Sequence, residues 1–229
     1  MERKRVALLG SSRGLGSCLA KTLSASNGFQ ILGVARKKGL LENQEVELGP
    51  WFEAFPFDLS RVDEFEALES KLAEFAPQHI LYVAGGGPYG PYDQVKFSAH
   101  QWAWRVSFEG AARVCHWSLK QPHLPQVVLV GSAICEDLGD LHGASYSAAK
   151  HALKGLYLSL RVEKPTWDLR LFSPGYLDTE LLPKGASVRY KKVWDPEEVS
   201  VRFIDWMLDE ELLGDHHSDS AYPPNGSVI

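Results

Sequence analysis

A glycine-rich segment near the N-terminus constrains the fold more than any other feature. The apolar run Val6–Leu9 predicts a buried strand, and a helical pattern with a leucine stripe continues to about Ser26. Between them, glycines permit a tight turn, and the helix N-terminus offers free N–H groups to an anion. An ordinary tight turn is the alternative, but the position favours a phosphate cradle. Its residues are Gly10, Ser11, Ser12, Arg13, Gly14, Leu15 and Gly16.

Strand and helix patterns alternate along the rest of the chain. This alternation predicts an α/β fold with a mostly parallel sheet covered by helices on both faces. At 229 residues, we expect one domain. Further strands are expected at about 30–35, near 57, and at 79–84, 127–130 and 169–172. Further helices are expected at about 62–75, 99–119 and 145–163, and from 195 onward.

Basic residues follow the second strand. Arg36 and Lys37 occupy the place where an NAD-binding fold carries an acidic residue for the ribose hydroxyls, and a basic residue there accommodates a 2′-phosphate. Arg13 in the glycine segment adds a nearby cation. A solvated charge run is the alternative. The location favours NADP(H) over NAD(H).

A tyrosine and a lysine stand four residues apart at Tyr146 and Lys150. Positions i and i+4 share one face of a helix, so both side chains can enter one pocket. A phenol titrates near pH ~10, about three pKa units above the best value for a proton donor at neutral pH. A lysine charge ~4 Å away, at an effective dielectric of ~20, supplies roughly that difference. The spacing therefore suits a tyrosine acid/base with a lysine that lowers its pKa.

Together with Ser132, these features resemble those of the short-chain dehydrogenases/reductases, over roughly residues 5 to 180. The resemblance implies a doubly wound Rossmann fold that binds NADP(H) and transfers hydride between the nicotinamide and a carbonyl or alcohol. It makes Tyr146 the acid/base, Lys150 the group that holds the ribose, and Ser132 the hydrogen-bond partner of the substrate oxygen. Further positions that the resemblance assigns to the cofactor are Asp58, Leu59, Ala84, Gly85, Gly86, Pro174, Gly175 and Thr179.

The chain departs from this family pattern in three places. Ser107 stands where the family often has a catalytic Asn that holds a water in a proton relay, Tyr82 and Val83 replace asparagines, and the C-terminal tail does not match. We expect Ser107 to take the relay position with a shorter reach. These departures motivate the alternative function, an NADP(H)-binding sensor or scaffold with little turnover.

Other segments have weaker functional signals. Residues 180–195 match the family's substrate lid in position, and their cations are expected to be solvated. The tail at about 215–229 is expected to be irregular, with no metal site at His216 and His217. Tyr89 and Tyr92 are plausible pocket walls, whereas His142 is expected to be solvated. For the tryptophans Trp102, Trp104 and Trp117 we expect packing or a subunit interface rather than cofactor stacking.

Composition limits the partners. A net charge of −5 argues against non-specific nucleic-acid binding, and no apolar stretch reaches membrane-spanning length. Three widely spaced cysteines suit reduced thiols, so a cytoplasmic location is expected. The expected partner is a small carbonyl or alcohol substrate. The family resemblance adds a homodimer or homotetramer.

Overall fold

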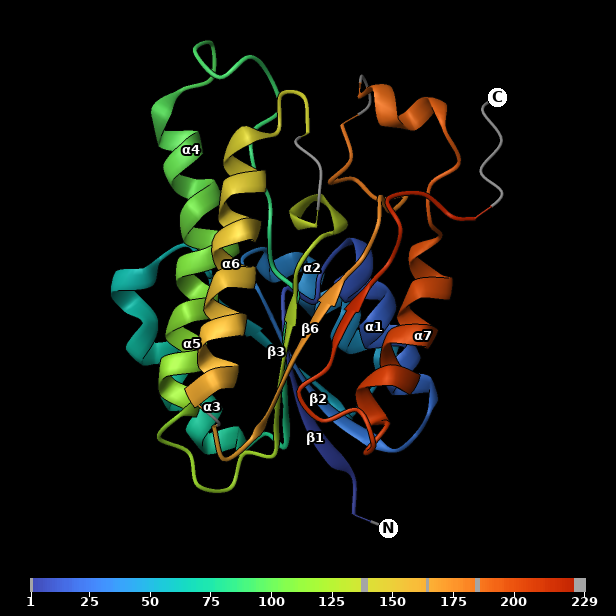
Figure 1. Cartoon of the computed structure of the whole chain (residues 1–229). Coiled ribbons are helices and arrows are strands. Elements are labelled where there is room, and N and C mark those ends of the chain that lie inside the picture. The colour runs from blue at the N-terminus through green and yellow to red at the C-terminus, as the bar shows by residue number, and fades with distance from the viewer. Residues whose placement is uncertain (1, 137–139, 164, 184–185, 225–229) are drawn as a thin grey trace.

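Seven parallel strands form one sheet in the computed structural model, which describes residues 2–136, 140–163, 165–183 and 186–224 (Figure 1). The sheet order is β3-β2-β1-β4-β5-β6-β7. Strands β2 and β3 are therefore added on one side of β1 and the later strands on the other side, and the order of addition switches between β1 and β4. Such a switch point opens a crevice beyond the carboxyl ends of the strands. The predicted doubly wound α/β fold is confirmed. The strands are β1 (Lys4–Leu9), β2 (Phe29–Ala35), β3 (Phe52–Pro56), β4 (His79–Tyr82), β5 (Gln126–Val130), β6 (Asp168–Ser173) and β7 (His216–Ser218).

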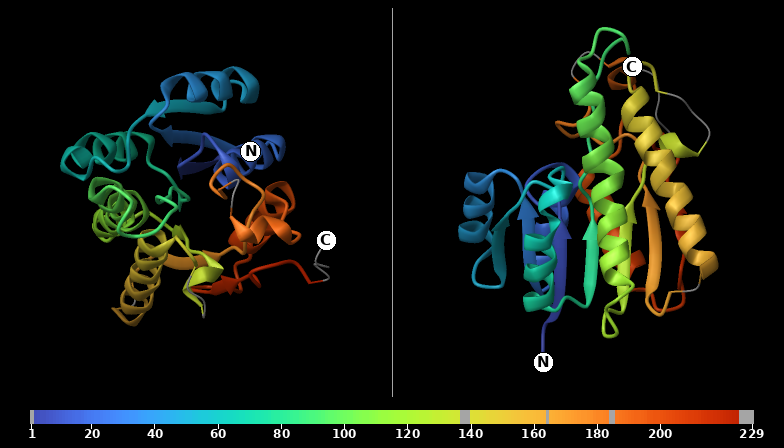
Figure 2. Two further views of the ribbon diagram at one scale, coloured as in Figure 1. Left: turned by 90° about the horizontal axis from the view of Figure 1, so that it is seen from above. Right: turned by 90° about the vertical axis from the view of Figure 1, so that its left-hand side faces the viewer.

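Helices cover both faces of the sheet, as two views show (Figure 2). One face carries α3 (Phe65–Phe75), α4 (Phe97–Trp104), α5 (Gly110–Ser118) and α6 (Ala144–Glu163). The other carries α1 (Gly14–Ala25), α2 (Lys38–Leu48) and α7 (Pro196–Leu208). Alternate strand residues enter the two cores, so Ala7 and Leu9 pack on one side, and Val6 and Leu8 on the other. Both cores fix the strand ends from which the site is built.

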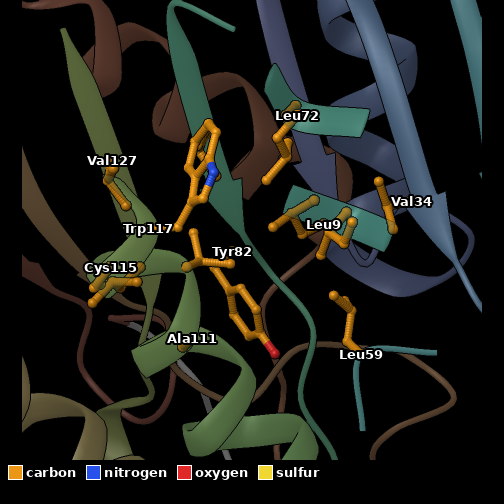
Figure 3. Packing of buried hydrophobic residues seen from close by; sticks show 14 of the residues in the cluster. Leu9, Val34, Leu59, Leu72, Tyr82, Ala111, Cys115, Trp117 and Val127 are labelled. Carbon is orange, nitrogen blue, oxygen red and sulfur yellow. The ribbon is translucent and has the colours of Figure 1, made fainter. Parts of the chain in front are cut away.

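The helix predicted at 99–119 is interrupted by a π turn at Arg105–Glu109. Within it the Gly110 N–H bonds to the Arg105 carbonyl five residues back. The buried Tyr82 hydroxyl donates to the Val106 carbonyl at 2.8 Å, and Figure 3 shows this side chain within the core. A Cβ on Gly110 would lie 2.3 Å from that hydroxyl, so the glycine makes room for it. Tyr82 therefore stabilises an irregular helix that a periodic pattern could not reveal.

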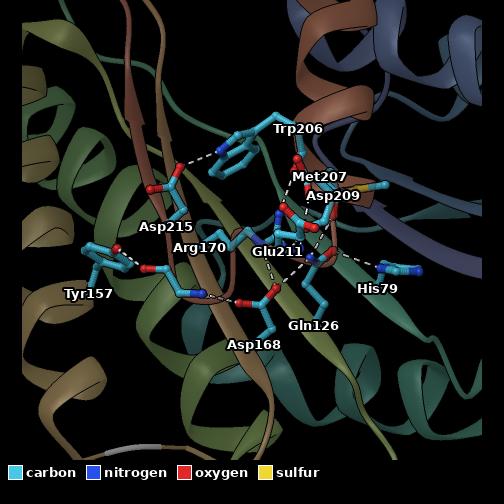
Figure 4. A network of polar contacts seen from close by, with 11 residues as sticks. His79, Gln126, Tyr157, Asp168, Arg170, Trp206, Met207, Asp209, Glu211 and Asp215 are labelled. Atoms are coloured by element: carbon cyan, nitrogen blue, oxygen red, sulfur yellow. Dashed lines mark hydrogen bonds and ion pairs between the residues drawn. The ribbon is translucent and has the colours of Figure 1, made fainter.

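The segment after α7 is not wholly irregular. Residues His216–Ser218 pair in parallel with β6, with Leu171 opposite His216. A buried network of polar contacts lies near the start of β6. There Arg170 donates to the Asp168 carboxylate at 2.6 Å and to the carbonyls of Trp206 and Asp209 (Figure 4). A strand of three residues is too short to show the alternating pattern from which a strand is predicted. Residues 225–229 lie outside the described part of the chain.

Candidate functional site

A cavity of about 390 Å³ lies beyond the carboxyl ends of the strands, on both sides of the switch point. Its volume falls in the range of small-molecule and cofactor sites. Most of the predicted positions line it together, although they come from distant parts of the sequence. They are Gly10, Ser12, Arg13, Gly14, Leu15, Gly16, Arg36, Asp58, Leu59, Ala84, Gly85, Gly86, Tyr146, Lys150, Pro174 and Thr179.

The glycine segment forms the floor of this cavity. Gly10 has φ +105°, and a Cβ there would lie 2.6 Å from the Ala84 backbone nitrogen, so only glycine fits. Helix α1 then begins at Gly14, and its N-cap residue Arg13 makes no side-chain hydrogen bond to the first N–H groups. Uncapped N–H groups at a helix N-terminus bind phosphate well. The local structure therefore fits the pyrophosphate of a dinucleotide.

The outer end of the cavity is built from Arg36 and Asp58, which follow β2 and β3. Arg36 is exposed, while Asp58 accepts hydrogen bonds from the backbone N–H and hydroxyl of Ser60. Arg13 lies nearby but is paired with Glu180 at 2.5 Å. At this end of the cavity, the guanidinium of Arg36 has no carboxylate partner among the described residues, whereas that of Arg13 is paired with Glu180.

Three predicted cofactor positions, Ser11, Lys37 and Gly175, do not line the cavity. Gly175 lines an adjoining cavity instead. Ser11 is fully buried, and its hydroxyl and carbonyl face Gln44 on α2. Lys37 is the N-cap residue of α2 and is exposed. Ser11 and Lys37 directly follow residues that do line it, Gly10 and Arg36 respectively. Their assignment to the cofactor surface is not supported by their positions.

Tyr146 and Lys150 lie one turn apart on α6, as their spacing predicts. Lys150 is 1% exposed, its Nζ donates to the Val130 carbonyl at 2.6 Å, and it lies 5.6 Å from the centre of the Tyr146 ring. Burial lowers the pKa of Lys150 to about 8. Burial also raises the pKa of Tyr146, while the Ser132 hydroxyl acts in the opposite direction. The expected net lowering of the phenol pKa is therefore not found in this structure, because desolvation dominates.

A second cavity adjoins the first, and Tyr146 lines both. Ser132 follows β5 and lines this second cavity together with Gly175. Its other walls are mostly apolar or aromatic and include Tyr89, Ile134, Tyr176, Leu181, Leu182 and Pro183. Tyr146 thus stands at the junction of the first cavity and this mostly apolar one, and Ser132 lines the apolar cavity beside it. Tyr89 is confirmed as a wall, whereas Tyr92 stacks on His100 instead.

Ser107 lies in the π turn and is fully buried. Its hydroxyl accepts from the Gly86 N–H and donates to the Gly86 carbonyl, both at 3.0 Å. The one hydroxyl hydrogen is used in this pair. Ser107 therefore fixes the loop after β4 in this structure, and its role in a relay stays a prediction.

The comparisons with known proteins identify the family. The family model described as short chain dehydrogenase matches residues 4–187. The chain belongs to this family. A 3-ketodihydrosphingosine reductase fusion protein of Schizosaccharomyces pombe is 24% identical over 76% of this chain, and the alignment covers 39% of that protein's length. Among solved structures, 4-hydroxyisoleucine dehydrogenase complexed with NADH has a TM-score of 0.83 at 17% identity, covering 96% of this chain and 98% of that one. BdcA in complex with NADPH has a TM-score of 0.81 at 21% identity, covering 96% and 94%.

The segment predicted to form a substrate lid includes the described residues 180–183 and 186–195. Arg189 donates to the carbonyls of Thr179, Leu182 and Pro183 and pairs with Asp178. Lys191 lies over the Tyr222 ring. Arg189 therefore holds the backbone of this segment. This differs from the expectation that the cations of the segment are solvated. Lys184 lies outside the described residues.

Several residues of the cavity were not found from the sequence. Trp102 lines the dinucleotide cavity from α4, contrary to the expectation of packing or interface roles alone. Val83, Val106 and Leu181 also line it. The described residues contain no group of three or more potential metal ligands, and no helix long and apolar enough to cross a membrane.

Proposed function

We propose that this short-chain dehydrogenase transfers hydride between NADP(H) and a carbonyl or alcohol substrate, with Tyr146 as the acid/base. One observation carries the proposal: Tyr146 stands where the dinucleotide cavity meets the apolar cavity. A proton donor at this junction can reach an oxygen of a substrate held in the second cavity. The glycine floor and the uncapped α1 terminus fit the dinucleotide.

The residues divide the chemistry among them. The nicotinamide, when bound, supplies or accepts the hydride. In reduction, Tyr146 gives its proton to the carbonyl oxygen, and Ser132 on the same cavity wall donates a hydrogen bond that stabilises the developing negative charge. Lys150 holds the ribose hydroxyls with hydrogens not used at Val130. The apolar walls exclude water and receive the body of the substrate.

The shifted pKa values are compatible with this division. Burial raises the pKa of Tyr146, so the phenol carries its proton at neutral pH, as a donor in reduction must. Burial lowers the pKa of Lys150 to about 8, and its ammonium remains the major form at pH 7. A cation close to the phenol favours phenolate formation as the proton leaves. Reduction is therefore the direction that the resting protonation states support.

Preference for NADP(H) over NAD(H) rests on Arg36. Its guanidinium lines the outer end of the cavity, beside Asp58 and beyond β2, where a 2′-phosphate would lie. No carboxylate is paired with Arg36 among the described residues. The named structural neighbours include one with NADH and one with NADPH, so the support for this preference comes from Arg36.

The test is nucleotide oxidation by the purified protein with a panel of aldehydes, ketones and quinones, using NADPH and NADH in parallel. Turnover with NADPH in excess of NADH is expected on some of these compounds. Tyr146→Phe should lower turnover by ~10² to 10⁴ and leave the Kd for NADPH unchanged. Tyr157→Phe is the matched control, because it removes another phenol from α6 whose hydroxyl bonds to the Gly214 carbonyl outside both cavities. Equal turnover by Tyr146→Phe and wild type would contradict the assignment.

An NADP(H)-binding sensor with little turnover is the second candidate. The observation favouring it is the Ser107 hydroxyl, which takes the place of the family's relay Asn and makes both of its hydrogen bonds to Gly86. Tight NADPH binding with no turnover on any compound would support the sensor. A fast Tyr146-dependent reaction would exclude it and show that proton supply does not require Ser107.

We further propose a homodimer or homotetramer in the cytoplasm. The exposed side chains of Trp104, Leu158 and Val162 on α4 and α6 support an association surface there. Light scattering after size-exclusion chromatography should give two or four times the chain mass of 25.5 kDa. A monomer at micromolar concentration would contradict the assembly.

A further inference from the structure

Trp102 and Arg36 meet across the outer end of the dinucleotide cavity. The guanidinium carbon of Arg36 lies 5.2 Å from the centre of the Trp102 ring, within the range of a cation–π contact. Arg36 follows β2 and Trp102 belongs to α4, so the pair joins elements from the two sides of the switch point. Both side chains line the cavity. A flat aromatic surface is thus presented at the end where an adenosine group would lie.

The indole is held in place by the chain around it. A Cβ on Gly86 would lie 2.8 Å from Cη2 of Trp102, so the ring edge packs directly against the loop after β4. The same glycine is held by Ser107 through two hydrogen bonds. Trp102 precedes the π turn and Ser107 lies within it, and both side chains reach Gly86. The interrupted helix therefore both fixes the loop and presents the ring.

The one polar atom of this ring has no hydrogen-bond partner among the described residues. The Trp102 indole N–H is buried and makes no hydrogen bond to any described residue. A buried donor left unpaired costs free energy, and such atoms are often explained by a function. The ring itself is only half-buried, so part of its surface remains available at the cavity.

We propose that Trp102 is the stacking platform for the purine of the nucleotide cofactor, with Arg36 as the partner that turns to the 2′-phosphate. The inference rests on the proposed function, since it assigns a part of the same cofactor site. Base stacking on an aromatic side chain is worth enough to change a dissociation constant about tenfold or more. Trp102 is therefore a binding residue for adenosine, whereas the 2′-phosphate preference belongs to Arg36.

The experiment measures Kd for AMP and for adenosine 2′,5′-bisphosphate by calorimetry on the full chain. Trp102→Leu should weaken both ligands about tenfold by the same factor, and Trp102→Phe should weaken both by less because a ring remains. Trp51→Leu is the control: it removes an indole that is 46% exposed, lies under the Arg3 guanidinium and does not line the cavity. Wild-type affinity in both Trp102 variants, or equal losses in Trp51→Leu, would overturn the proposal.

Fluorescence gives a second readout, which also serves if Trp102→Leu does not fold. Excited at 295 nm, the wild-type protein should lose emission on binding either ligand because the purine covers an indole. Trp102→Phe should abolish most of this quenching, and its persistence would overturn the proposal. Failure of the NADP(H) preference is a different result: AMP and the bisphosphate would then bind wild type equally, while the Trp102 effect on both remained.

Discussion

Replacing Lys150 with methionine tests whether burial of the ammonium is costly. Lys150 is 1% exposed, and burial lowers its pKa from 10.5 to about 8. The unfolded chain therefore binds more protons than the folded chain between pH 8 and 10.5, and the free energy of unfolding rises with pH across this window. The cost of the buried charge, about 3 kcal/mol, is fully present below pH 8 and is lost as the lysine becomes neutral.

The assay is urea denaturation of wild type and Lys150→Met at pH 7, 8, 9 and 10. The variant has no titrating group at this position. The stability of wild type minus that of the variant should therefore rise by about 2 to 3 kcal/mol from pH 7 to pH 10. Loss of the hydrogen bond to Val130 adds a nearly constant offset and does not change this slope. Lys120→Met, which removes an exposed lysine, is the control for loss of a lysine as such. A flat or falling difference would refute the assigned burial cost.

Two further predictions concern ion pairs. Arg170→Met should lower the free energy of unfolding by about 3 to 5 kcal/mol in urea denaturation, because it leaves the buried Asp168 carboxylate without its cation. Turnover per folded molecule should stay unchanged. A loss of stability below about 1 kcal/mol would contradict this prediction. Glu180→Gln should release Arg13 and tighten the Kd for NADPH up to about fivefold at low salt in a fluorescence titration, since exposed pairs are worth at most about 1 kcal/mol. Weaker NADPH binding by Glu180→Gln would show that the pair supports the site.

Local patterns were enough to predict the elements that build the cavity. The apolar run at Val6–Leu9, the glycines after it and the leucine stripe of α1 each follow from short-range chemistry, and the structure has them as a strand, a turn and a helix. The spacing of Tyr146 and Lys150 gave their shared helix face for the same reason. Parallel strand order then brings the ends of these segments together.

Other features depend on contacts between distant residues. The π turn relies on Tyr82 bonding to Val106, and β7 relies on a parallel neighbour in β6, so neither has a local signature. The pKa of Tyr146 follows from how much of the chain surrounds it, which the spacing to Lys150 cannot give. Trp102 was assigned to packing or an interface because helical periodicity does not say what lies opposite a side chain.

The most direct test of the account is a single-turnover reaction with NADPH deuterated at the transferable position of the nicotinamide. The substrate is a carbonyl compound found in the panel. Mass spectrometry should find one deuterium in the alcohol formed by wild type. With Tyr146→Phe, the same product should form ~10² to 10⁴ times more slowly at an unchanged Kd for NADPH. Deuterium transfer at the wild-type rate by Tyr146→Phe would contradict the role of this tyrosine, and product without deuterium would contradict hydride transfer itself.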